Sequence, residues 1–98
     1  MLDAEMKIKQ RAIDSRVVKL KSHLEHVIGK IKFYDDELIP VLKEQANFME
    51  EAFRMGEGSY LEYMISVEDI NNLQIERLEM LRDFYINLIE LKYWTSDF

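Results

Sequence analysis

Two histidines are the side chains best suited to metal chemistry. His23 and His26 lie three residues apart with Glu25 between them, and on a helix this spacing places both imidazoles on one face, where they could bind a transition metal. A tight metal site normally has three or four ligands, and the chain has no cysteine to add one. We therefore interpret the pair as solvated helix residues and predict no metal site.

Acid–base catalysis is the second chemistry that the residue types suggest. Neighbouring acids such as Asp35 and Asp36 would point in different directions on a helix and so would not act on one substrate together. The chain shows no constellation of nucleophile, base and orienting group, and no glycine-rich phosphate loop after a strand. We predict that the protein is not an enzyme and binds no cofactor.

Methionine could indicate the handling of soft metal ions, since the chain has six. Four of them fall on apolar stripes of the expected helices: Met6, Met55, Met64 and Met80. Core packing explains them better, because methionine fills irregular gaps between helices.

The composition predicts the scaffold that carries these side chains. The 98 residues are 48% hydrophobic and 33% charged, with one proline and three glycines, which favours an all-α fold in a single domain, residues 1–98. The net charge of −6 argues against binding to nucleic acid. No apolar run suits a signal peptide or a spanning helix, so we expect the chain by itself neither to be exported nor to insert as a helix.

The first half of the chain is written as heptads from residue 13. Steps of four and three reach a seam in which only Gln45 is polar: Ile13, Val17, Leu20, Leu24, Val27, Ile31, Tyr34, Leu38, Val41, Gln45, Phe48, Ala52 and Met55. A seam of this length predicts a long helix, about residues 3–55, packed as a coiled coil against a partner.

Pro40 lies inside this seam and removes one backbone hydrogen bond. The seam steps through Pro40 without a change of phase, which favours a continuous helix with a kink. The alternative is a break into two helices, with Asp35 or Asp36 capping the second.

The segment "GEGS", residues 56–59, ends the seam and reverses the chain. Gly56 and Gly58 are expected to supply positive φ angles, and Ser59 with Glu62 matches a capping box for a second helix at about residues 60–95. This helix carries two apolar stripes. A long antiparallel hairpin leaves one stripe uncovered, so we expect self-association, with two hairpins forming a four-helix bundle. The stripes are Tyr60, Met64, Val67, Leu78, Leu81, Tyr85 and Leu88, and Tyr63, Ile70, Leu73, Met80, Phe84, Leu91 and Trp94.

The stretch from residue 34 to residue 94 resembles the last helical repeat of the TolC-like outer membrane efflux proteins. It is most similar to the branch that serves heavy-metal and cation pumps of the resistance-nodulation-division (RND) type. The matching pattern runs in order along the sequence: Leu38 to Pro40, Ala46, Ala52 with Phe53, Gly56, Ser59, and Tyr60 to Tyr63.

This resemblance implies a passive transport function. Such proteins are trimers whose paired helices form a periplasmic tunnel, and whose helix turns meet the periplasmic adaptor protein of the pump. The match places Gly56 on the tip glycine and Phe53 on the aromatic three residues earlier, with Glu57, Gly58 and Ser59 completing the tip. Glu62 matches an acid that in some members rings the pore mouth and attracts cations.

Two departures qualify the resemblance. Gly58 replaces a longer polar residue that locks the closed tip in some members, and Ile65 stands where some carry a second acid. The family also has β-strands and a signal peptide, so the chain is expected to be an excised helical portion or part of a fused inner-membrane pump, in the bacterial cell envelope. The other interpretation is a free-standing coiled-coil interaction or scaffolding protein whose seam binds another helix.

Overall fold

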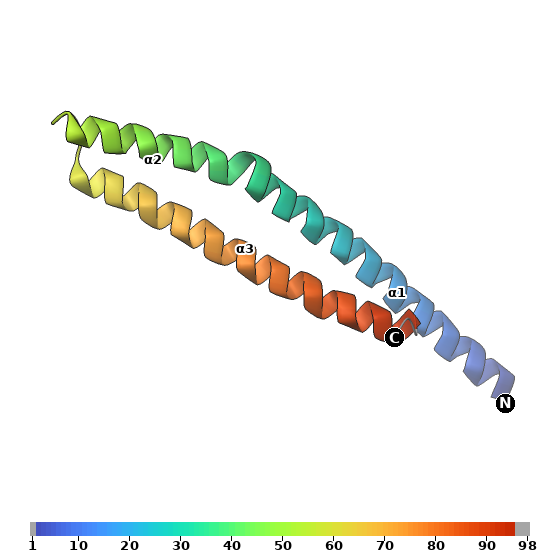
Figure 1. Cartoon of the computed structure of the whole chain (residues 1–98). Helices are drawn as coiled ribbons and strands as arrows, with labels where there is room; N and C mark the ends of the chain where they lie inside the picture. Colours follow the sequence, from blue (N-terminus) through green and yellow to red (C-terminus); the bar gives the residue numbers. More distant parts are fainter. Residues whose placement is uncertain (1, 96–98) are drawn as a thin grey trace.

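The computed structural model describes residues 2–95, and this part of the chain is all-α with no strand. The elements in order are α1 (Leu2–Phe33), a π-helical turn η1 (Tyr34–Leu38), α2 (Ile39–Arg54) and α3 (Tyr60–Thr95). They form a rod of 79 × 21 × 16 Å, with a bend in the first helical run at η1 (Figure 1). The prediction of an all-α chain with two long helices and a bend is confirmed. Residues 1 and 96–98 of the predicted domain lie outside the described residues.

The first helical run and α3 lie side by side and run antiparallel. Arg16, early in the first run, pairs with Glu90 near the end of α3. Met49, near the end of the first run, accepts a hydrogen bond from Ser66 near the start of α3. Within the described residues the buried core is small and belongs to the first run: Leu20, Leu24, Val27, Ile39 and Ala46. The amino-terminal end of α1 extends beyond the end of α3 (Figure 1).

The predicted seam is correct up to Leu38, and after it only Ala52 of the seam residues is half-buried. From Ile13 to Leu38 every seam position is buried or half-buried. Beyond η1 the seam residues Val41, Phe48 and Met55 are 59%, 72% and 72% exposed. The buried or half-buried positions come one residue after the predicted ones: Ile39, Leu42, Ala46 and Met49.

The π turn explains this jump in phase. The Ile39 N–H donates to the Tyr34 carbonyl, five residues back instead of four, so η1 holds one residue more than an α-helical turn and rotates the rest of the helix by about 100°. Pro40, which has no N–H, comes immediately after Ile39. The helix is therefore continuous and bent, as expected. The sequence argument for continuity assumed no change of phase at Pro40, whereas the structure has a phase jump that the π turn absorbs. Phe33, at the start of η1, has helical φ and ψ angles and no side-chain cap, so the alternative of a capped break is not observed.

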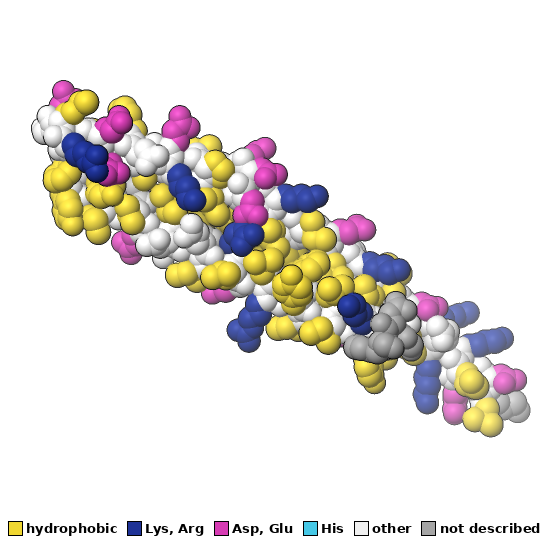
Figure 2. Space-filling model, viewed as in Figure 1, with side chains coloured by type: hydrophobic (Ala, Val, Ile, Leu, Met, Phe, Trp, Pro, Cys, Tyr) yellow, Lys and Arg dark blue, Asp and Glu magenta, His cyan; other side chains and the backbone are white. Residues whose placement is uncertain are grey.

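The two stripes of α3 have different environments. Tyr63, Ile70, Leu73, Met80, Phe84 and Leu91 of one stripe are half-buried against the first run. The other stripe is mixed, because Val67, Leu81 and Leu88 are half-buried but Tyr60, Met64, Leu78 and Tyr85 are exposed. Hydrophobic side chains consequently appear on the molecular surface along the rod and at its connecting end (Figure 2).

The methionine prediction is only partly correct. Met80 is half-buried, but Met6, Met55 and Met64 are 65%, 72% and 42% exposed. Met6 extends past the end of α3, and Met55 lies after the phase jump that turns its seam outward. Among the helices of the described residues, none is both long enough and apolar enough to cross a bilayer.

Candidate functional site

The candidate site at the connecting end is the tip, which we define as Phe53, Gly56, Glu57, Gly58 and Ser59. α2 ends in a Schellman motif centred on Gly56, whose φ is +77°. The Gly56 N–H donates to Phe53 O at 3.0 Å, and the Glu57 N–H donates to Ala52 O at 2.8 Å. These bonds satisfy carbonyls that would otherwise be unpaired at the helix end. Gly56 has the left-handed backbone conformation that the motif requires, and glycine adopts it with the least strain.

Gly58 serves a different purpose from the one predicted, because only Gly56 has a positive φ angle among the described glycines. A Cβ atom at Gly58 would lie 3.0 Å from the Phe53 nitrogen and 3.1 Å from the Ala52 Cβ. The chain passes so close to the end of α2 that a side chain at residue 58 would force the backbone to shift.

The start of α3 is capped from the same turn. Ser59 Oγ accepts from the Glu62 N–H at 3.4 Å, which is the serine half of the predicted capping box. The structure gives no bond from the Glu62 carboxylate back to Ser59 within the described residues. Across the turn, the rings of Phe53 and Tyr60 lie 5.5 Å apart at 55°, so an aromatic contact joins α2 to α3.

A matched pair of alanine substitutions tests the tip geometry. Gly56→Ala should lower the free energy of unfolding by about 1 kcal/mol, because alanine opposes a left-handed backbone. Gly29→Ala should raise it by about 0.5–1 kcal/mol, since Gly29 lies inside α1 with open space around it. Urea denaturation at one protein concentration measures both changes. Two changes of the same sign would contradict the structural roles given to these glycines.

A column of acids runs along one flank of α3 at seven-residue spacing. The acidic column, as we call it, consists of Glu62, Asp69, Glu76, Asp83 and Glu90. Steps of seven return to nearly the same side of a packed helix, so these carboxylates share one flank. The sequence analysis singled out only Glu62, although the spacing could have identified all five.

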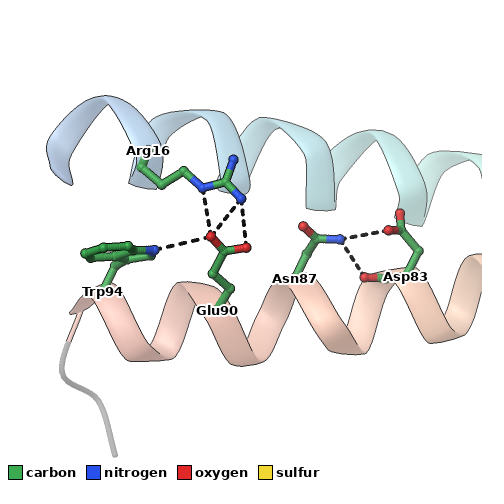
Figure 3. A network of polar contacts seen from close by, with 5 residues as sticks. All are labelled: Arg16, Asp83, Asn87, Glu90 and Trp94. Atoms are coloured by element: carbon green, nitrogen blue, oxygen red, sulfur yellow. Dashed lines mark hydrogen bonds and ion pairs between the residues drawn. The ribbon is translucent and has the colours of Figure 1, made fainter. Parts of the chain in front are cut away.

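Two acids of the column, Asp83 and Glu90, are bound by α1; we call them its basal half. Arg16 donates to both carboxylate oxygens of Glu90 at 2.8 Å, and Trp94 donates to Glu90 at 3.3 Å (Figure 3). His23 Nε2 lies 2.7 Å from Asp83 Oδ2, and Asn87 donates to the other carboxylate oxygen of Asp83 at 2.9 Å (Figure 3). Arg16 and His23 are themselves seven residues apart, so a basic column faces an acidic one.

The π turn is held to α3 by two polar contacts. Tyr34 donates to Glu76 at 2.9 Å, and Arg77 donates to Asp35 through two nitrogens. Because they are neighbours in sequence, Glu76 and Arg77 engage the turn together. Arg77 lies seven residues from both Ile70 and Phe84, which are apolar. A charged residue in this apolar heptad position could have indicated the contact with Asp35, but the sequence analysis did not use it.

These contacts shift several pKa values. The bond from Arg77 lowers the pKa of the Asp35 carboxyl, and the same bond raises the pKa of Arg77. Bonds from Arg16, and then Trp94, lower the pKa of Glu90. The bond to the Glu76 carboxylate raises the pKa of the Tyr34 phenol. All four groups are therefore held in the forms that maintain these contacts at neutral pH.

The lowered carboxyl pKa values predict acid sensitivity. Because the pKa values of Asp35 and Glu90 are lower in the folded chain, their contribution to stability is present above the unfolded carboxyl pKa, about 4, and is lost as the pH falls through the folded values. Tm should therefore fall between about pH 5 and pH 2 more steeply in wild type than in the double variant Asp35→Asn/Glu90→Gln. Parallel curves would contradict this expectation, and calorimetry across the pH range measures it.

The two histidines lie beside one open hollow on α1. His23 is engaged with Asp83, and both histidines border an open hollow of 540 Å³ with Val18, Lys19 and Ser22. The described residues contain no group of three or more His, Cys, Asp or Glu that could hold a metal ion. His23 instead acts as a cross-helix partner, a role the sequence analysis did not assign.

The structure thus brings all the sequence-predicted site residues to one end of the rod. The tip residues and Glu62 meet there, and six of the residues lining a 200 Å³ hollow lie within or beside the turn: Met49, Ala52, Glu57, Gly58, Ser59 and Glu62. This arrangement presents aromatic, backbone and acidic groups to a partner, with no reactive constellation among the described residues. Comparisons of the protein with protein-family models, with curated proteins and with solved structures find no match.

Proposed function

We propose that this protein is a helical interaction module, a hairpin that acts by packing against further helices. The observation that carries the proposal is the exposed apolar side of α3. We call this side the α3 outer face, and its residues are 42–65% exposed: Tyr60, Met64, Ile75, Leu78, Tyr85, Ile86, Ile89 and Tyr93.

The exposed area supports the need for a partner. The chain exposes 7870 Å², whereas a compact monomer of 11.8 kDa would expose about 5,900 Å². The eight side chains of the α3 outer face, at roughly 100 Å² each, offer about 800 Å². That area is what each partner of a stable complex typically buries, which favours the packing of two hairpins as a four-helix bundle.

Sedimentation of the purified chain tests this function. We expect a dimer at about 100 µM, and Leu78→Glu should raise the dissociation constant at least tenfold by placing a charge in the α3 outer face. Val18→Glu is the matched control, because Val18 is 66% exposed on α1, away from this face. A wild-type chain that stays monomeric at this concentration would contradict self-association through the α3 outer face.

A second candidate function is the periplasmic tunnel portion of an outer membrane efflux protein in a tripartite RND-type pump. It is favoured by the tip, where Phe53 is 42% exposed beside the sharp turn at Gly56 at one end of a long rod. In this function the tip would contact the periplasmic adaptor protein, and Glu62 would face the pore mouth of a trimer. Binding of a purified heavy-metal pump adaptor should then weaken in Phe53→Ala and be unchanged in Val18→Ala. Equal binding by both variants would remove the tip from the contact.

A further inference from the structure

A groove with an apolar floor runs beside the acidic column, between α2 and α3. We call it the tip-side groove. It includes a hollow of 400 Å³ lined by Leu38, Leu42 and Leu73, with Asp69, Asn72 and Glu76 at its edge. The three leucines are half-buried and remain reachable from solvent. A purely solvated charged flank would have no such floor, so the groove combines the two features of a helix-binding surface.

The acids beside this groove lack basic partners. Glu62 and Asp69 form no ion pair within residues 2–95, and Glu76 receives only the hydrogen bond from the Tyr34 hydroxyl. No lysine or arginine lines the 400 Å³ hollow formed by the three leucines, and none lines the 200 Å³ hollow beside the turn. This half of the acidic column therefore differs from the basal half, where Arg16 and His23 are bound.

The heptad positions of the first helical run explain this difference. Before the π turn, α1 carries Arg16, His23 and Lys30 at seven-residue intervals along this flank. An unbroken seven-residue spacing would continue this flank with Glu37 and Glu44, whereas the one-residue jump places Leu38 and Gln45 there instead. Basic side chains on this flank therefore end at Lys30, and the π turn places an apolar and a neutral residue where two further acids would otherwise face the acidic column.

We propose that the tip-side groove binds an amphipathic helix of another protein that carries a basic side chain at every seventh position beside an apolar seam. The chain itself shows the chemistry of the occupant, because α1 meets the same column with Arg16 and His23 seven residues apart. Glu62 to Glu76 spans 14 residues, or about 21 Å of helix, so a partner helix of about three heptads covers it.

Charge favours another protein over a second copy. The chain carries a net charge of −6, so a second copy has no excess of basic side chains to offer the groove, whereas a basic helix is attracted and oriented. In a second copy, Arg16 and His23 would also be occupied, since they bind its own α3. The inference rests on the proposed interaction function, and names the chemistry of one partner.

A synthetic peptide of three heptads tests the groove. The probe has leucine at both seam positions and lysine at one flanking position of each heptad, and its binding to the full chain is measured by fluorescence anisotropy. Asp69→Asn/Glu76→Gln should weaken binding about tenfold, because each exposed ion pair changes affinity by about twofold to fivefold. The matched control Glu68→Gln/Glu79→Gln removes the same charge elsewhere on α3, and should leave the affinity within about twofold.

The outcomes separate this inference from the proposed function. Equal weakening by both double variants, or equal binding of a peptide with glutamate in place of lysine, would overturn the tip-side groove as a specific site. Loss of peptide binding with intact self-association in sedimentation would overturn the inference alone. A monomeric chain that still binds the lysine peptide as expected would overturn self-association and leave the groove in place.

Discussion

Replacing Leu20 by alanine should lower the free energy of unfolding by about 3 kcal/mol, the largest effect expected from a single side chain. Leu20 is 2% exposed and is the most buried of the five buried side chains within residues 2–95. Removing a buried leucine side chain loses its transfer free energy and leaves a cavity, which together typically cost about 2–5 kcal/mol. In a chain with so small a core, this is a large share of the total stability.

Val18→Ala is the matched control for Leu20→Ala, because Val18 lies two residues away on α1 and is 66% exposed. Its change should be within about 0.5 kcal/mol. Urea denaturation at a fixed protein concentration measures both variants, since association would make stability depend on concentration. Equal effects of the two substitutions would contradict the placement of the core on the Leu20 side of α1.

Deleting one residue from the π turn should be tolerated, whereas the same deletion in α1 should be severely destabilising. Without Glu37, and with Pro40→Ala to restore the backbone donor, a regular α-helix would carry the buried face of α1 directly into Ile39 and Leu42. The free energy of unfolding should then equal or exceed that of wild type. The π turn exists only because the sequence holds one residue more than the α-helical register requires.

The control deletes Glu25, an exposed residue in the regular part of α1, again with Pro40→Ala. The segment after the deletion turns by about 100°, which moves Val27 and Ile31 away from α3. We expect a loss of about 3 kcal/mol or more, from the exposure of several core side chains. If both deletions were equally damaging, the extra residue in η1 would not explain the phase jump. Pro40→Ala alone should retain the π turn, because the packing of α2 on α3 requires the shifted phase.

The two proposed surfaces, the α3 outer face and the tip-side groove, differ in how far the sequence alone could predict them. The α3 outer face follows only in part from the sequence: Tyr60, Met64, Leu78 and Tyr85 belong to a predicted stripe, because a helix with two apolar sides needs two neighbours. Its other four residues were in neither predicted stripe: Ile75, Ile86, Ile89 and Tyr93. The tip-side groove could not be predicted in the same way. It depends on the change of phase at η1, which places Leu38 instead of Glu37 next to the acids of α3.

The sequence alone determined the all-α class, the heptad seam as far as Leu38 and the reversal at Gly56 to Ser59. These features depend on local rules, namely the 3.5-residue spacing of apolar side chains and the left-handed residue of a helix C-terminus. Tertiary structure decided which face of α2 is buried. Beyond Leu38 two registers are available, since Val41 is followed by Leu42, and Phe48 by Met49. Both registers are apolar in sequence, and only packing against α3, with the π turn beside Pro40, selects the one that buries Ile39 and Ala46.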